Sequence, residues 1–492
     1  MSHAVRVRLA VLALGFVALA GAKPQCPPPE PGTIRTTDRG PVEGLRYHDT
    51  DAYLGIPYAA PPVGDLRWRP PEDVTPWTEP LATKDFKSVC PQPTKEIFAG
   101  PEARGEDCLY LNVWTPADPP AEPLPVMLWL HGGSNVSGSA SFLAYDGRPL
   151  SEAGDVVVVT INYRLGSLGF MAHEALSAES PDGVSGNYGL LDQIAALQWV
   201  QRNAAAFGGD PNQVTLFGES AGGTDTCVLL TSPLAAGLFD RAIVQSGRCG
   251  TKSLAAAEAD GAKLADAMGC TGAPDVATCM RAVSQEDLMA VQRAFRGGFA
   301  PAVDGHIVPM AVRDAFEAGA QHPVPVIMGG NRDEEQLFLP VLPDLGRSSY
   351  EAFVEERYGD LGPEAVEGIL ALYPWEDFWD PREAAVTLTT DEGWRCPLRR
   401  NLRALVATHA APVYRYEFTR VLDTPILRDL GAFHGLEIFF VFDTLGIIPL
   451  PYTRNNPTNE ALIEAMQGYW TRFAHTGDPN GGGAVAWPAY AA

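Results

Sequence analysis

Short apolar runs recur along the central part of the chain, and each is rich in β-branched residues. The runs cover Pro125–His131, Asp155–Tyr163, Gln213–Glu219, Arg241–Gly247, Val324–Gly330 and Pro412–Phe418. A strand covered on both faces shows no alternation of polar and apolar positions. Continuous runs of this length therefore predict buried strands of a mostly parallel sheet.

Stretches with a helical period separate these strands. Before the third run, Ile194, Leu197 and Val200 recur at helical spacing, and Gly208 with Gly209 ends the helix. Strands that alternate with helices predict a doubly wound α/β core with helices on both faces.

Three regions depart from this alternation. Residues 32–114 are rich in proline and turn residues, which predicts an irregular antiparallel edge with loops. Residues 254–294 and 350–409 predict helices that lie outside the sheet, where such insertions commonly wall an active site. No shift in composition marks a linker, so we expect residues 23–492 to form one domain with insertions.

Composition and charge argue against some classes of binding partner. With 46% hydrophobic and 20% charged residues, the chain of 492 residues has the make-up of a soluble globular protein with a large core. Its net charge of -24 argues against nucleic acid or an anionic membrane as partner, because no basic cluster is available to neutralise phosphates.

The N-terminus is typical of an exported protein. Residues 1–22 combine early positive charge, the apolar run Leu9–Ala20 and small residues suited to cleavage after Ala20 or Ala22. The apolar run is too short for a comfortable membrane span, and no later segment is long and apolar enough. We expect a secreted or periplasmic protein, in which the eight cysteines make disulfides plausible and buried free thiols the alternative.

The strongest chemical motif is Gly218-Glu219-Ser220-Ala221-Gly222, which matches GxSxG. A good strand precedes it and a good helix follows, so we expect a sharp turn that projects the Ser220 hydroxyl. The helix N-terminus and the Ala221 amide would stabilise negative charge beside it. The alternative is a structural turn without chemistry.

A serine nucleophile needs a base, and five histidines follow Ser220. They are His306, His322, His409, His434 and His475. The order serine, acid, histidine of α/β-hydrolases admits all five. We favour His434, because it lies late in the chain in a glycine-flanked loop.

The acid that orients the base should follow a strand between Ser220 and His434. Asp333, Glu334 and Glu335 come directly after the strand at 324–330. The pattern leaves these three nearly equal, and a solvated acidic turn is the alternative reading.

Three longer motifs carry a resemblance to a known family. They are EDCLYLNVWTP at 106–116, the segment from GNYGLLDQ to GESAGG at 186–223, and HGLEIFFVF at 434–442. With them the chain resembles the type-B carboxylesterases, which include cholinesterases and some lipases, over nearly its whole mature length. The resemblance implies an α/β-hydrolase fold and ester hydrolysis through an acyl-enzyme.

The resemblance also implies roles for individual residues. Ser220 matches the nucleophile, His434 the base, and Glu334, four residues before Phe338, the acid. Ser246 matches a serine that supports the triad, with a strand-end turn as its alternative reading, and Glu219 is retained as in many members. The implied oxyanion hole consists of the amides of Gly133, Ser134 and Ala221, and the implied disulfides are Cys90–Cys108 and Cys270–Cys279.

Two departures from the family lie in the active-site motifs. The oxyanion loop usually has three glycines and then an aromatic or apolar residue, whereas this chain has Gly132-Gly133-Ser134-Asn135. Asp225 stands where a serine is common, and it would shift nearby pKa values or face solvent.

Two further departures concern specificity and cysteine pairing. Phe98 is the single aromatic residue between Cys90 and Cys108, where cholinesterases have a tryptophan for the substrate cation. Choline esters are therefore disfavoured as substrates. Cys396 resembles a cysteine whose usual partner lies beyond this C-terminus, so we expect it to be free or paired with Cys249.

The sequence thus predicts a serine carboxylesterase that acts on uncharged or anionic small-molecule esters. The alternatives are a lipase-like member for longer acyl chains and a non-catalytic binding ectodomain of the same fold. We expect no cofactor and no metal, because HExxH, clustered His/Cys and nucleotide-loop motifs are all missing from the sequence. The oligomeric state is not indicated.

Overall fold

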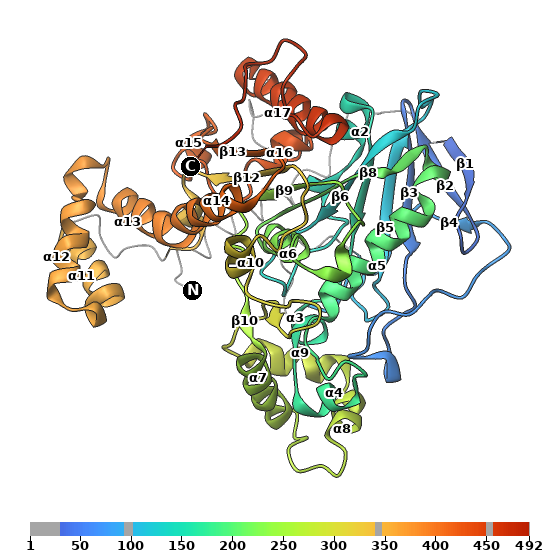
Figure 1. The fold of residues 1–492 in the computed structure, drawn as a ribbon, viewed down its shortest axis with the longest axis horizontal. Coiled ribbons are helices and arrows are strands. Elements are labelled where there is room, and N and C mark those ends of the chain that lie inside the picture. The colour runs from blue at the N-terminus through green and yellow to red at the C-terminus, as the bar shows by residue number, and fades with distance from the viewer. Residues whose placement is uncertain (1–29, 93–101, 340–346, 449–455, 492) are drawn as a thin grey trace.

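The computed structural model describes residues 30–92, 102–339, 347–448 and 456–491 (Figure 1). The predicted signal peptide and Phe98 lie outside these ranges. The described residues form an eleven-stranded sheet in the order β1-β2-β3-β5-β7-β6-β8-β9-β12-β13, with β4 paired to β2. The strands are β1 (Glu30–Thr36), β2 (Pro41–Tyr47), β3 (Thr50–Pro57), β4 (Leu81–Ala82), β5 (Tyr110–Pro116), β6 (Leu124–Leu130), β7 (Val157–Ile161), β8 (Gly209–Glu219), β9 (Arg241–Gln245), β12 (Val326–Asn331) and β13 (Val413–Phe418).

The sheet changes character along its width. The pairs from β7 through β6, β8, β9 and β12 to β13 are parallel. The N-terminal pairs β1/β2, β2/β3, β3/β5 and β5/β7 are antiparallel. All six predicted strands are present, and the predicted antiparallel edge is confirmed, although it is more regular than expected.

Helices cover both faces of the sheet because the parallel strands are apolar on both sides. In β6, Val126 and Leu128 pack into one core layer and Met127 and Trp129 into the other, as the two-residue period of a strand requires. The first layer contains side chains of α5 (Tyr188–Asn203), α6 (Ala221–Leu229), α10 (Val312–Ala318) and α14 (Cys396–Thr408). The second contains side chains of α2 (Arg148–Gly154), α16 (Ile438–Val441) and α17 (Pro457–Thr476).

The remaining helices are insertions between strands. As predicted, residues 254–294 fold as helices outside the main sheet, beside the small sheet of β10 (Lys252–Ser253) and β11 (Ala302–Val303). Of the second predicted insertion, α11 to α13 (residues 347–390) project away from the sheet in Figure 1, whereas α14 packs against the sheet, contrary to the prediction. The helices concerned are α3 (Gly166–Phe170), α4 (Glu174–Glu179), α7 (Leu254–Ala267), α8 (Val276–Ala282), α9 (Gln285–Ala294), α11 (Arg347–Tyr358), α12 (Pro363–Leu372), α13 (Pro381–Thr390) and α15 (Pro425–Arg428).

Three disulfides join parts of this fold. Two of them, Cys90–Cys108 and Cys270–Cys279, are the pairs that the family resemblance implies. The third joins Cys227 to Cys249, so of the two expectations for Cys396, free or paired with Cys249, the pairing is wrong. Cys227 lies on α6 and Cys249 follows β9, and these neighbouring elements meet. Cys396 is exposed and bonds to no described cysteine.

Within the described ranges, every helix is too short or too polar to cross a bilayer.

Candidate active site

The turn between β8 and α6 presents Ser220 at the carboxyl edge of the sheet. Ser220 has φ 58° and ψ -117°, and its main-chain N–H donates to the Gln245 carbonyl at 2.9 Å. A Cβ on Gly218 would lie 2.6 Å from the Gly222 main chain, and one on Gly222 would lie 2.0 Å from the Leu130 carbonyl oxygen. Glycine is thus required on either side of a strained serine, and strain of this kind is typical of functional turns.

The predicted base and its orienting carboxylate lie together at the ends of two other segments. His434 Nδ1 lies 2.6 Å from Glu334 Oε2, and Glu334 is fully buried after β12. The other oxygen of Glu334, Oε1, accepts hydrogen bonds from Ser246 Oγ at 2.6 Å and from the Asn331 N–H at 2.7 Å. These bonds fix the carboxylate so that it accepts the Nδ1 proton of the imidazole.

The other imidazole nitrogen faces Glu219. His434 Nε2 lies 3.1 Å from Glu219 Oε1. Among the described residues, no hydrogen bond joins Ser220 to His434. Catalytic hydrogen bonds are often long in the absence of substrate and tighten when it binds.

Three buried carboxylates, those of Glu219, Glu334 and Glu437, surround this histidine. Burial opposes the imidazolium, but Glu219 and Glu334 outweigh it and raise the pKa of His434 to about 9. Burial also raises the pKa of Glu219 and that of Glu437, whose carboxylate accepts a bond from Asn331 Nδ2. At neutral pH the cluster therefore keeps protons that isolated carboxylates would lose.

The loop after β6 lies directly against the serine turn. A Cβ on Gly132 would lie 2.9 Å from Ser220 Cβ. In the part of the chain that the structure describes, the main-chain N–H groups of Gly133, Ser134 and Ala221 make no hydrogen bond within the protein. Three unused donors thus lie in the two segments that flank Ser220.

His131, at the start of this loop, is a structural residue. It is buried, stacks on Tyr163 at 4.5 Å between ring centroids, and burial lowers its pKa to about 4. The Tyr163 hydroxyl donates to the His131 carbonyl at 2.7 Å. These contacts hold the end of β6 in place.

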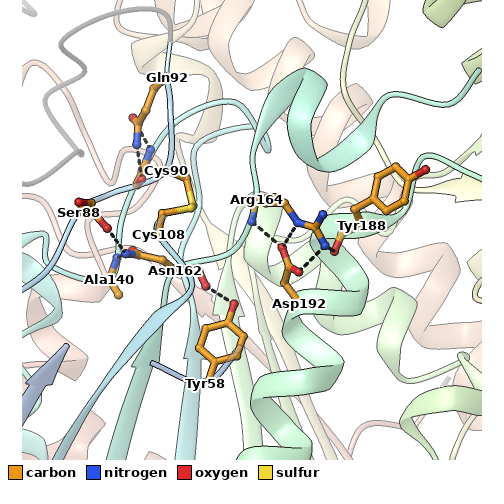
Figure 2. Close-up of a disulfide and its surroundings, with 11 residues drawn as sticks. Tyr58, Ser88, Cys90, Gln92, Cys108, Ala140, Asn162, Arg164, Tyr188 and Asp192 are labelled. Carbon is orange, nitrogen blue, oxygen red and sulfur yellow. Dashed lines mark hydrogen bonds and ion pairs between the residues drawn. A yellow bond between two sulfur atoms is a disulfide. The ribbon is translucent and has the colours of Figure 1, made fainter. Parts of the chain in front are cut away.

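Gln92, close to the disulfide Cys90–Cys108, holds the far end of the same loop. Gln92, two residues beyond Cys90, donates to the Gly138 carbonyl at 2.7 Å and accepts from the Gly138 N–H at 3.1 Å. Figure 2 shows Gln92 beside this disulfide, and Asn162 bonded to the main chain of Ala140 and Ser88. The loop is thus held at both ends by side chains from other segments.

The other acids and histidines that the sequence offered for the triad have other partners. Asp333 accepts from the Ala432 N–H at 2.7 Å, and Glu335 accepts from Trp394 Nε1 at 2.8 Å and from Arg248 at 2.8 Å. Of the other histidines after Ser220, three bond main-chain carbonyls away from the site and one lies near Asp182. They are His322, His409, His475 and His306.

An aromatic wall beside the imidazole was not predicted from the sequence. Trp394 packs 4.6 Å from His434, and Phe338 lies 5.2 Å from it in an edge-on arrangement. Trp394 belongs to a π-helix at Asp391–Arg395. Such widened turns often occur at functional sites, but a helical sequence pattern does not reveal them.

The site has no arrangement of side chains suited to a metal. Among the described residues, no group of three or more His, Cys, Asp or Glu side chains could hold an ion. The chemistry available is that of a hydroxyl, an imidazole, carboxylates and main-chain amides.

A mostly parallel sheet, covered on both faces and bearing a strained serine turn after β8, defines an α/β-hydrolase. A solved structure of a para-nitrobenzyl esterase superimposes with a TM-score of 0.81 at 36% identity, covering 93% of each chain. The model of the carboxylesterase family matches residues 31–492, and the chain belongs to that family.

Two curated relatives are esterases. The chain is 39% identical to a fumonisin B1 esterase of Sphingopyxis macrogoltabida, over 94% of this chain and 85% of the relative. It is 37% identical to the para-nitrobenzyl esterase of Bacillus subtilis (strain 168), over 93% and 92%. The protein is therefore a carboxylic ester hydrolase, and the alternative of a non-catalytic ectodomain is set aside.

Proposed function

We propose that the protein hydrolyses esters through an acyl-enzyme on Ser220. His434 takes the proton of the Ser220 hydroxyl as its oxygen attacks the ester carbonyl, and then gives that proton to the leaving alcohol. Glu334 holds the imidazole in the tautomer with Nδ1 protonated and stabilises the imidazolium. Water, activated by His434, then attacks the acyl-enzyme and releases the acid.

One observation carries this proposal. Glu334 takes donors from Ser246 and Asn331 on one oxygen and the His434 ring on the other, and it is fully buried. A carboxylate with these partners and this burial does not fit the alternative reading, a solvated acidic turn. It is suited to fixing one imidazole beside the turn that carries Ser220.

The unused amides support the second part of the mechanism. In the tetrahedral intermediate, the former carbonyl oxygen becomes negative, and the N–H groups of Gly133, Ser134 and Ala221 bind it. Amides fixed in advance cost no reorganisation during the reaction, and the loss of one such donor typically lowers kcat about 100- to 1000-fold. The N-terminus of α6 adds favourable partial charge.

The walls of the site favour apolar groups on the ester. Phe338 is 55% exposed although it is a large aromatic residue, and it lies next to Trp394 and His434. Aromatic alcohols or acyl groups of uncharged esters would pack against it. One relative is named a para-nitrobenzyl esterase, which supports esters with a nitroaromatic group as probes.

Active-site labelling tests the mechanism. The full chain is treated with a fluorophosphonate, the adduct is located by mass spectrometry, and turnover of p-nitrophenyl acetate is measured in wild type and Ser220→Ala. We expect one adduct on Ser220 and a loss of turnover of about 10⁴-fold or more in the variant. Undiminished turnover in Ser220→Ala without an adduct would overturn the proposal. Acetate to dodecanoate esters in the same assay separate an esterase from a lipase-like enzyme.

We also propose that the protein is exported. Three disulfides fit an oxidising compartment outside the cytosol. Mass analysis of the mature N-terminus after expression in a bacterial host tests this, with cleavage after Ala20 or Ala22 as the expected result.

A further inference from the structure

A second buried carboxylate lies close to the active site but outside the proposed mechanism. Asp225, on α6, is fully buried five residues after Ser220. The described residues give it two side-chain donors, and both are neutral amides: Gln193 Nε2 at 2.7 Å and Asn135 Nδ2 at 3.2 Å. A buried acid without a cationic partner is costly to keep. Burial raises its pKa to about 7, although the two amide bonds oppose the shift.

Asn135 belongs to the loop that carries the proposed oxyanion donors, and the backbone of this loop is strained. Gly133 has φ 113°, and the non-glycine residues Ser134 and Asn135 both have φ 56°. Asparagine adopts the left-handed conformation more readily than serine, so the backbone strain of this loop lies mainly at Ser134. A Cβ on Gly133 would lie 2.2 Å from the Ser137 carbonyl oxygen, so the turn is also tightly closed.

Three contacts from other segments fix Asn135. Its Nδ2 donates to Asp225, its Oδ1 lies 3.3 Å from the Tyr163 hydroxyl, whose proton goes to the His131 carbonyl, and its main-chain oxygen accepts from the Gly166 N–H at 2.6 Å. The side chain is 3% exposed. An aromatic or apolar residue could fill this space by packing, whereas asparagine needs an acceptor, and Asp225 provides it.

We propose that Asp225 is a positioning residue for ester hydrolysis: through Asn135 it holds the oxyanion loop so that the Gly133 and Ser134 amides point at the developing oxyanion. This inference rests on the proposed function, in which those amides bind the tetrahedral intermediate. The two departures from the family pattern in the active-site motifs, Asn135 and Asp225, thereby become one interaction.

The hydrogen-bond pattern predicts which substitutions this interaction tolerates. Asn135 keeps its Nδ2 turned toward position 225, because the acceptor that this nitrogen needs lies there. Gln193 Oε1 is buried and has no hydrogen-bond partner among the described residues, so turning the amide over would break no bond of this oxygen. In Asp225→Asn, the new Oδ1 would still accept from Asn135, and the new Nδ2 would donate to a rotated Gln193 Oε1. In Asp225→Leu, which is of similar size, no acceptor remains for Asn135.

The test compares these two variants in the full chain. For each, kcat and KM for p-nitrophenyl acetate are measured per active site titrated with a fluorophosphonate. The inhibition constant of a trifluoromethyl ketone, which forms a tetrahedral oxyanion on serine, is measured in parallel. We expect Asp225→Asn to stay within about threefold of wild type. Asp225→Leu should lose about 100-fold in kcat and a similar factor in ketone affinity, with KM changed by less than about threefold.

A second variant covers a failure of Asp225→Leu to fold. Asn135→Ala removes the same hydrogen bond from the loop side, and we expect a parallel loss in kcat and ketone affinity. Wild-type kcat per titrated site in Asp225→Leu or Asn135→Ala would overturn the inference, even with a lowered melting temperature. So would equal losses in Asp225→Asn and Asp225→Leu, because charge and not hydrogen-bond acceptance would then matter.

Failure of the inference and failure of the proposed function give different results. If wild type is not labelled on Ser220 and Ser220→Ala keeps its turnover, the proposed function fails whatever the Asp225 variants do. If Ser220 is labelled and essential while Asp225→Leu is fully active, the inference alone fails.

Discussion

Two buried carboxylates near Ser220, Glu334 and Asp225, have opposite surroundings. Glu334 contacts an ionisable imidazole and accepts a hydroxyl and a main-chain N–H. Among the described residues, Asp225 accepts hydrogen bonds from the side-chain amides of Gln193 and Asn135 and from no other group. A carboxylate beside an imidazole can stabilise a charge that appears during the reaction, whereas one among amides can only fix positions. Burial alone therefore does not tell the function of a carboxylate, but its partners do.

The largest expected loss of activity follows from replacing Glu334, whereas replacing its neighbour Glu335 should cost much less. Glu334→Gln removes the acceptor that selects the Nδ1-protonated tautomer, so kcat for p-nitrophenyl acetate should fall about 10⁴-fold. The matched control is Glu335→Gln, which touches Trp394 and Arg248 and should cost less than about tenfold. A larger loss in Glu335→Gln would move the acid by one residue.

The region around Glu334 also shows which features could be predicted from the sequence and which could not. The buried strands were readable because each is a continuous apolar run, and GxSxG is a local motif. The preference for Glu334 over Asp333 and Glu335 came from the family resemblance, since three adjacent acids look alike locally. In the structure they differ because the turn after β12 directs one toward His434, one toward the Ala432 N–H and one toward Trp394.

Contacts between segments that are distant in the chain could not be predicted from the sequence. Asn135 and Asp225 were each noted as unusual, but their contact joins residues that become neighbours only when β6 pairs with β8. The pairing of Cys227 with Cys249 likewise depends on α6 packing next to β9. The sequence offered one hint that Asn135 and Asp225 interact: both depart from the family pattern in the active-site motifs.

A pH profile should distinguish Glu219, which faces the His434 ring, from Asp225, which faces neutral amides. The carboxylate of Glu219 raises the pKa of His434, and the base must be deprotonated to act. Glu219→Gln removes that charge, so the pKa of His434 falls and the acid limb of kcat/KM moves to lower pH, by roughly one unit. Asp225→Asn should leave this limb in place, because the carboxylates that raise the pKa of His434 are those of Glu219, Glu334 and Glu437. An unmoved limb in Glu219→Gln would show that the limb reports another group.

The smallest expected effect concerns Ser134. It is exposed at φ 56°, and glycine would adopt this conformation without strain while gaining freedom in the unfolded chain, so Ser134→Gly should change stability by less than about 1 kcal/mol. Activity on p-nitrophenyl acetate should be retained, and esters of bulky tertiary alcohols should be accepted better. Relative kcat/KM for tert-butyl and ethyl acetate measures this. A loss above about tenfold on both esters would reveal a function of the Ser134 side chain.

Asn135 also has a consequence for how the protein is produced. Asn135-Val136-Ser137 matches the acceptor sequence for N-linked glycosylation. The nitrogen that would carry the sugar is the one that bonds Asp225 in the folded chain. In a eukaryotic secretory host, a glycan attached before folding is complete would occupy that nitrogen, and such chains could not close the loop around Asn135. If such a host uses this acceptor sequence, the modified chains would lack the bond between Asn135 and Asp225.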